Sequence, residues 1–328
     1  MHHAVIREGG GTRIINEEGQ YIYESELMKD AEDKVESVGA AMTIVNNAGV
    51  ELVECSITEN GNVQRGVIFC AGNSTVSLKD CHVTDNKLGK DGAFCIAIVD
   101  SNAALDHCSV SDNDGRGIWA FKSELELKDC QISSNREGGI SCVKSTFNIY
   151  HNEIFENQCE YGNGAGIDCS GAKGDIINSK INLNESSGHG GGIRIIDSEV
   201  TLRKNDVSHN KANGWGGGLC ICGESTVTIS ECEVGYNQSE NSGGGLFLDC
   251  TSTIENCSIS MNNGGICGGG ICYEKESNGE LSGTTITLNE AESGGGVYVG
   301  QDAAIEFWAN QISSNRPDDI YRRDDIDF

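Results

Sequence analysis

The chain has very little proline and few aromatic residues. Of its 328 residues only one is Pro, and aromatic residues make up 6%. Because proline cannot donate a hydrogen bond to a strand ladder, its scarcity favours a long run of paired strands. No apolar run reaches the ~20 residues that a membrane-spanning helix needs, so we expect no membrane insertion.

Positive charge is also scarce. Lys and Arg number 23 against 50 Asp and Glu, which gives a formal net charge of −27, and the cations are scattered along the chain. An acidic surface is a poor match for nucleic acid, for anionic membranes and for polyanionic sugars. We therefore expect no nucleic-acid partner, and the charge alone helps to keep a long protein soluble.

From the N-terminal residues and the cysteine spacing we expect no secretory signal and no metal-binding cysteine pair. Met1-His2-His3 leads into no apolar stretch typical of a secretory signal, and the 16 Cys include no Cys-x-x-Cys pair. These features predict free thiols, no metal site, no cofactor and an intracellular protein in a reducing compartment. If Met1-His2-His3 is not native sequence, the signal argument fails, and a secreted or surface location stays open.

Glycine, by contrast, is abundant with 44 residues, and the chain is an internal repeat. An Asn recurs at intervals of 22 to 27 residues, at positions 60, 86, 113, 135, 157, 184, 210, 237, 262, 289 and 315. Three residues before each Asn stands a β-branched residue, from Ile57 and Val83 to Ile312. Eight residues before each Asn stands Leu, Ile or Phe, and after each Asn comes a short loop that ends in Gly.

This pattern predicts an all-β fold, a right-handed parallel β-helix of about eleven coils with three short strands in each coil. The period-two apolar residues form the strands, and the Asn and Gly residues form the corners. A leucine-rich repeat has a similar period, but β-branched residues and Gly dominate here in place of a Leu-rich consensus. Right-handedness follows from the crossover rule for parallel strands.

Stacking explains two columns of side chains. The Asn at each corner can tolerate the left-handed conformation and can hydrogen-bond to the Asn of the next coil. Five residues before it lies an inward column of small residues: Cys55, Cys81, Cys108, Cys130, Asn152, Ser179, Asn205, Cys232, Cys257, Thr284 and Asn310. We expect these cysteines to pack as small buried hydrophobes.

The two ends of the chain lie outside the repeat. Residues 1–40 form an expected N-terminal cap, in which Leu27, Ala31 and Val35 share a helical face over Ser25–Glu36. Residues 41–315 form the β-helix, and the charged segment 316–328 forms a C-terminal cap or tail. A cap is expected because an open coil exposes a strand edge.

Units of the form Ile/Val-x-x-Asn…Gly-Gly-Gly-Ile/Leu/Val resemble the pectin-lyase-like superfamily of right-handed β-helices. Among these the repeats are similar to those of chlamydial polymorphic outer-membrane proteins, with Ile or Val in place of a Phe, and to non-enzymatic β-helix repeats of eukaryotic scaffold proteins. The resemblance covers about residues 40–315 and implies the fold more than a function, because one fold hosts many roles.

The superfamily contains polysaccharide hydrolases and lyases, so the resemblance also raises an enzymatic alternative. Gly188-His189-Gly190 and Arg194 are similar to polygalacturonase elements, but those elements lie on different coils in that family and within one coil here. No Asp pair accompanies them, although glycoside hydrolysis needs two carboxylates. We therefore predict no catalytic residue.

One outward column is unusually apolar. On the strand that follows each Gly corner, it comprises Ile68, Cys95, Trp119, Ser141, Asp168, Arg194, Cys220, Phe247, Cys272 and Tyr298. An exposed apolar face of this kind is typical of a docking surface, although loops could fold over it instead. We predict a protein partner there, with Trp119, Arg194, Cys220, Phe247, Cys272 and Tyr298 as binding residues.

The function predicted from the sequence is therefore a non-catalytic rigid scaffold or protein-interaction module, a subunit of a larger assembly. The alternative is a carbohydrate-active enzyme or a surface adhesin, with carbohydrate as its ligand. Two or more converging carboxylates beside Arg194 would favour the enzyme, and Phe247 and Tyr298 buried against another chain would favour the scaffold.

Overall fold

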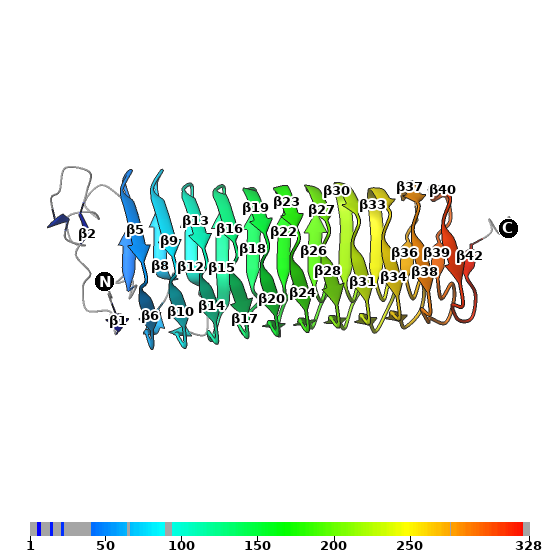
Figure 1. Cartoon of the computed structure of the whole chain (residues 1–328), viewed down its shortest axis with the longest axis horizontal. Helices are drawn as coiled ribbons and strands as arrows, with labels where there is room; N and C mark the ends of the chain where they lie inside the picture. Colours follow the sequence, from blue (N-terminus) through cyan, green and yellow to red (C-terminus); the bar gives the residue numbers. More distant parts are fainter. Residues whose placement is uncertain are drawn as a thin grey trace.

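The computed structural model describes residues 5–7, 14–15, 21–22, 41–63, 66–88, 94–275 and 277–323. These residues form a right-handed parallel β-solenoid, a rod of stacked coils with the chain advancing by one coil per repeat (Figure 1). The described residues contain no helix, and so no helix among them could span a membrane. The predicted helix Ser25–Glu36 lies outside the described residues.

One sheet carries the β-branched residues that precede each Asn. It has 12 strands, in the order β1 (Val5–Arg7), β6 (Ser56–Thr58), β10 (His82–Thr84), β14 (Ser109–Ser111), β17 (Gln131–Ser133), β20 (Glu153–Phe155), β24 (Lys180–Asn182), β28 (Asp206–Ser208), β31 (Glu233–Gly235), β34 (Ser258–Ser260), β38 (Thr285–Thr287) and β41 (Gln311–Ser313). Every neighbouring pair in it is parallel and in register, as Ile181, Val207 and Val234 illustrate.

The other two faces of each coil belong to a 21-stranded sheet with two parallel ladders. The ladder after the Gly corner comprises β4 (Met42–Ile44), β8 (Gly66–Ala71), β12 (Phe94–Val99), β15 (Arg116–Phe121), β18 (Ile140–Val143), β22 (Ile167–Ser170), β26 (Ile193–Ile196), the start of β30 (Leu219–Ser230) and of β33 (Leu246–Glu255), β36 (Ile271–Tyr273), β39 (Val297–Val299) and β42 (Ile320–Arg322). The second ladder comprises β5 (Gly49–Val53), β9 (Thr75–Lys79), β13 (Asn102–Asp106), β16 (Glu124–Lys128), β19 (Thr146–Tyr150), β23 (Lys173–Ile177), β27 (Glu199–Arg203), the ends of β30 and β33, β37 (Asn278–Ser282) and β40 (Ala304–Trp308).

Short two- and three-residue strands follow the Asn corner in several coils. They are β7 (Gly61–Val63) with β11 (Lys87–Leu88), and β21 (Gln158–Cys159), β25 (Glu185–Ser186), β29 (Lys211–Ala212), β32 (Gln238–Ser239) and β35 (Asn263–Gly264). The remaining pair, β2 (Ile14–Ile15) with β3 (Tyr21–Ile22), is antiparallel. The three strands per coil that the sequence predicts are thus present, and these short strands add a fourth element.

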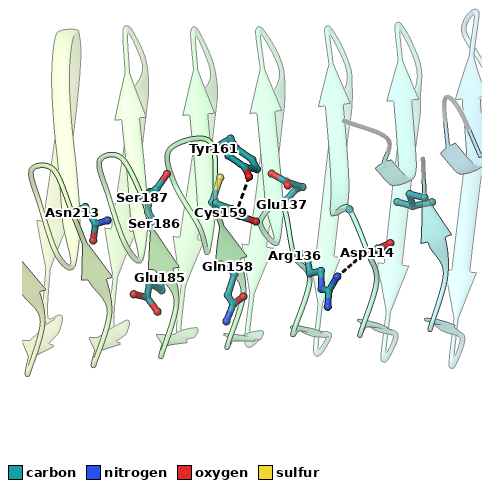
Figure 2. Close-up of a pocket in the computed structure, with 13 residues that line it drawn as sticks. Asp114, Arg136, Glu137, Gln158, Cys159, Tyr161, Glu185, Ser186, Ser187 and Asn213 are labelled. Carbon is teal, nitrogen blue, oxygen red and sulfur yellow. Dashed lines mark hydrogen bonds and ion pairs between the residues drawn. The ribbon is translucent and has the colours of Figure 1, made fainter. Parts of the chain in front are cut away.

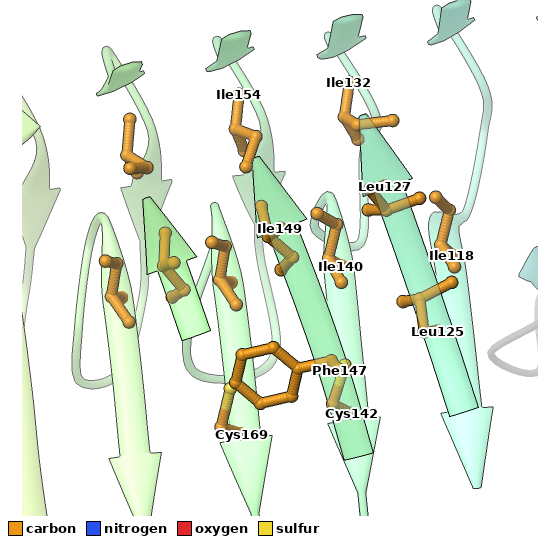
Figure 3. Packing of buried hydrophobic residues seen from close by; sticks show 14 of the residues in the cluster. Ile118, Leu125, Leu127, Ile132, Ile140, Cys142, Phe147, Ile149, Ile154 and Cys169 are labelled. Atoms are coloured by element: carbon orange, nitrogen blue, oxygen red, sulfur yellow. The ribbon is translucent and has the colours of Figure 1, made fainter. Parts of the chain in front are cut away.

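The core consists of columns of stacked apolar side chains that point inward from all three faces. Ile118 and Ile140, Leu127 and Ile149, and Ile132 and Ile154 converge from the three faces, and each is fully buried (Figure 3). Each such side chain stabilises the fold by about 1.5–3 kcal/mol relative to its exposed state. Larger side chains are matched by smaller neighbours: the Phe147 ring lies against the position of Gly174 in the next coil.

The Asn column forms a continuous buried ladder. Most of these Asn residues donate from the backbone N–H and from the side-chain Nδ2 to the Oδ1 of the next Asn, as Asn184 does to Asn210 at 3.1 and 3.0 Å. The same Nδ2 also donates to a backbone carbonyl of the preceding coil, as Asn210 does to Ile181 at 2.8 Å. The stacked hydrogen bonding that the sequence predicts is confirmed.

The left-handed conformation falls on the residue before the Asn, so its predicted place on the Asn itself is wrong. Residues such as Leu183 and His209 have φ of 55° and 57°. A second left-handed column precedes the inward Cys column at the other corner. The inward cysteines of that column are buried as expected: Cys55, Cys81, Cys108, Cys130, Cys232 and Cys257.

Candidate functional site

The outward column after the Gly corner holds most of the residues that the sequence singles out. Register places Trp119, Arg194, Cys220, Phe247, Cys272 and Tyr298 in one continuous row on neighbouring strands. Two members were misplaced, because Phe69 and Ala97 occupy the row where Ile68 and Cys95 were predicted. Ile68 and Cys95 are buried.

The expected exposure of this row is wrong at its C-terminal end. Cys220, Phe247 and Cys272 are at most 2% exposed and Tyr298 is 8% exposed, and together they form a small apolar cluster outside the main core. The loops between the Asn and Gly corners cover the cluster: Trp215 stacks on Phe247 with ring centroids 4.9 Å apart. These side chains therefore stabilise the loops of their own chain.

The centre of the row is polar, as the sequence indicates. The guanidinium of Arg194 donates to a carboxylate oxygen of Asp168 at 2.9 Å, and both side chains are about one-fifth exposed. Trp119 is half-buried between Phe94 and Phe121, with ring centroids at 4.6 and 5.8 Å. Within the residues described, the apolar part of the row that stays partly exposed is at its N-terminal end, at Phe69 and Trp119.

A different surface carries exposed apolar side chains. The left-handed position before each corner Asn holds five consecutive residues that we call the apolar ridge: Leu183, His209, Tyr236, Met261 and Leu288. They follow β24, β28, β31, β34 and β38, strands of one face of the rod (Figure 1). All five are exposed, with 42–54% exposure for the four apolar members. His209 and Tyr236 stack with ring centroids 4.8 Å apart.

The equivalent positions of the earlier coils differ in chemistry. Glu59, Asp85, Asp112, Ser134 and Glu156 occupy the same left-handed corner with φ between 53° and 58°. Short polar residues such as Asp visit this conformation readily, whereas other L-residues pay roughly 1–2 kcal/mol. The fold therefore tolerates polar residues at this corner and does not require the apolar ones.

The ridge was missed in the sequence although its signal is visible there. The position before each repeating Asn changes from acidic or Ser to apolar or His between Glu156 and Leu183. Side chains next to a corner Asn can face either the solvent or the loop that follows the corner. In the structure they face the solvent. The periodicity alone thus located the column without revealing its exposure.

A groove of about 920 Å³ lies beside the N-terminal end of the ridge (Figure 2). We call it the acidic groove, and its lining includes four carboxylates and one guanidinium: Asp114, Glu137, Glu160, Glu185 and Arg136. Arg136 donates to Asp114 at 3.0 Å and Lys211 donates to Glu185 at 2.8 Å. Glu137 and Glu160 therefore provide the excess negative charge.

Glu137 is the most perturbed carboxylate of the groove. Partial burial raises the pKa of its carboxyl above the ordinary value, the charge of Arg116 opposes this, and Glu160 and Asp114 add to it. Tyr161, 83% exposed, donates its hydroxyl to Glu160 at 2.9 Å. The groove thus offers carboxylates next to an exposed aromatic ring, a combination suited to a cation.

The acidic groove and the apolar ridge are contiguous. A smaller hollow is lined by Leu183 of the ridge together with Arg136, Gln158 and Glu185, which also line the groove. One surface therefore runs from acidic to apolar along the rod.

The match to a family model agrees with the architecture. A family model described as a right-handed β-helix region matches residues 6–181. A search of curated proteins finds no match. Among solved structures, ORF18 of Geobacillus virus E2 is similar at 11% identity and a TM-score of 0.34, over 85% of this chain and 54% of that one. This chain thus spans about half the length of that protein.

Proposed function

Since the chain belongs to the right-handed β-helix family, its surface side chains repeat on a rigid rod, and we propose that it is a non-catalytic protein-interaction module. The apolar ridge and the acidic groove form its docking surface. The observation that carries this proposal is which residues occupy the left-handed position before the corner Asn. Four bulky apolar residues stand, exposed, at left-handed positions where other coils use Asp, Glu or Ser. Strain and exposure together cost stability, and such cost is typical of a functional surface.

The spacing of the ridge indicates the shape of the partner. Stacked coils are about 4.8 Å apart, so the five ridge residues span about 19 Å. An α-helix advances 5.4 Å per turn, which is close to the spacing of about 4.8 Å between neighbouring ridge residues. About 13 helical residues cover the 19 Å of the ridge. A helix laid along the rod axis would therefore place one apolar side chain against each coil.

The charge of the surface indicates the chemistry of the partner. The chain carries a net charge of −27, and Glu137 and Glu160 give the adjoining groove its excess negative charge. A second copy of this chain would be repelled, whereas Lys or Arg at one end of a helix would be attracted into the groove. We therefore assign the surface to a basic amphipathic helix.

A displayed library of 20-residue peptides tests this assignment. The ridge variant carries Leu183→Asn, Tyr236→Asn, Met261→Asn and Leu288→Asn, since Asn accepts the left-handed conformation. We expect selection on the wild type to enrich peptides with apolar residues at i, i+3 and i+4 and with Lys or Arg at one end. Their dissociation constants for the ridge variant should be at least about tenfold higher.

The matched control changes the same corner outside the ridge. The double variant Asp85→Asn/Asp112→Asn should bind the selected peptides within about twofold of the wild type. Peptides that bind the wild type and the ridge variant equally, or a selection that enriches no sequence, would overturn the assignment.

A carbohydrate-active enzyme is the second candidate, and it is favoured by two carboxylates in one groove, Glu137 and Glu160, since glycoside hydrolysis uses a pair of them. Partial burial raises the pKa of Glu137, the direction that a general acid needs. Assaying the wild type, the ridge variant and Glu137→Gln for binding and cleavage of a panel of neutral oligosaccharides distinguishes the two functions. Glycan binding or cleavage that Glu137→Gln abolishes, and that the ridge variant retains, would replace the docking function by the enzymatic one.

A further inference from the structure

Two thiols lie next to each other on the outer face of one strand. Cys220 and Cys222 belong to β30 and are separated by Ile221, whose side chain is fully buried in the core. Because alternate residues of a strand face the same side, both thiols point away from the core. No other two cysteines of the chain are separated by a single residue.

The register of the strands places a cation beside this pair. Arg194 of β26 pairs with Cys220, one coil away. The guanidinium of Arg194 also donates to Asp168 of β22, the strand on its other side. A positive charge therefore lies between a carboxylate and the two thiols.

The two thiols interact through one proton. The Cys220 thiol donates a hydrogen bond to the sulfur of Cys222, and this bond lowers the pKa of Cys222 and raises the pKa of Cys220. Burial opposes the ionisation of Cys222, whereas the charge of Arg194 favours it. Cys222 is therefore the sulfur that ionises first, and the thiolate is the form of cysteine that binds metals.

The pair is open to solvent on one side and covered on the other. Of the 16 cysteines, which all lie in the described part of the chain, two are partly exposed, Cys222 and Cys267. Cys220 is 1% exposed and packs in the apolar cluster with Phe247, which Trp215 covers. An ion can thus reach the pair through Cys222, while the apolar cluster shields Cys220 from water.

We propose that Cys220 and Cys222 bind one soft monovalent ion, Cu(I), as a two-coordinate dithiolate. Thiolate ligands favour Cu(I), Zn²⁺ and iron–sulfur clusters. Zn²⁺ and the clusters take about four protein ligands, but in the described residues Cys220 and Cys222 belong to no group of three or more metal-ligating side chains. Cu(I), a d¹⁰ ion, is stable with two thiolates in a line.

Binding would replace the proton that the two sulfurs share. Two Cu–S bonds form, the proton of Cys220 leaves to solvent, and neither sulfur nor copper changes its oxidation state. The dithiolate complex carries one negative charge, which Arg194 balances, and the net charge of −27 attracts the cation. The sequence-based expectation of no metal site rested on the absence of a Cys-x-x-Cys pair, which a two-coordinate ion does not need.

Anaerobic competition between the whole chain and the Cu(I) chelator bathocuproine disulfonate tests the proposal. We expect one Cu(I) per chain, held more tightly as the pH rises because binding releases a proton. Cys220→Ser and Cys222→Ser should each weaken binding at least about 100-fold, and Arg194→Gln about tenfold. Cys222 lies on the outer face, so its substitution leaves the core intact.

Cys267→Ser is the matched control, because Cys267 is also partly exposed but has no cysteine two residues away. It should bind Cu(I) as the wild type does. X-ray absorption of the copper complex should show two sulfur ligands and no nitrogen or oxygen ligand. Equal affinity in the wild type and Cys222→Ser, loss of binding in Cys267→Ser, or nitrogen and oxygen ligands at copper would mean an adventitious ion only and overturn the proposal.

Discussion

Asn210→Ala should lower the free energy of unfolding by about 4 kcal/mol. Asn210 accepts from the backbone N–H and from Nδ2 of Asn184, so its truncation removes the acceptor of two buried donors. It also removes the donation to the Ile181 carbonyl. Each buried polar group left without a partner costs about 1–3 kcal/mol. Urea unfolding followed by circular dichroism measures the change.

Asn102→Ala provides the comparison, because Asn102 is exposed at the start of β13 and lies outside the ladder. Its effect should stay within about 0.5 kcal/mol. If the two substitutions destabilise the chain equally, the buried Asn ladder does not stabilise the stack as argued.

Gly218→Ala should destabilise the chain by about 3 kcal/mol. A Cβ at this position would lie 2.7 Å from the Gly245 carbonyl oxygen and 2.9 Å from Nδ2 of Asn237. That carbonyl accepts from Leu219 N–H at 2.9 Å, so the next coil cannot move away without breaking the ladder. Overpacking of this kind typically costs about 1–3 kcal/mol, and here the added Cβ meets a backbone carbonyl and a hydrogen-bonded amide that cannot give way.

Gly61→Ala is the matched control, since no atom of the described residues lies within 4 Å of the added Cβ. Thermal unfolding should show a clear drop in midpoint for Gly218→Ala and little change for Gly61→Ala. An unchanged midpoint for Gly218→Ala would show that the Gly corner is not closely packed between coils.

The repeat made the fold predictable because equivalent residues occupy the same packing position in every coil. Ile181, Val207 and Val234 stack in register, as their spacing from the corner Asn indicates. The errors at Ile68 and Cys95 arose in early coils, whose Gly corners lack the Gly-Gly-Gly run that anchors later ones. Without this anchor, a shift of one or two residues along the strand cannot be detected from composition.

Exposure was harder to predict than register. Phe247 lies on the outer face of its strand as predicted, but Trp215 of the preceding loop covers it. Whether a loop folds back over a strand depends on contacts between side chains of different coils. The repeat pattern of the sequence does not reveal these contacts. The same limit concealed the apolar ridge, whose residues the sequence spaces regularly but does not show to be exposed.

The central claim is that the ridge side chains serve binding and not folding. The urea unfolding midpoint of the ridge variant tests it most directly. Asn suits the left-handed corner better than Leu, Met or Tyr, so we expect a gain of about 0.5 kcal/mol at each of the four sites, about 2 kcal/mol in total. A ridge variant less stable than the wild type would contradict the claim, because the apolar side chains would then stabilise the fold itself.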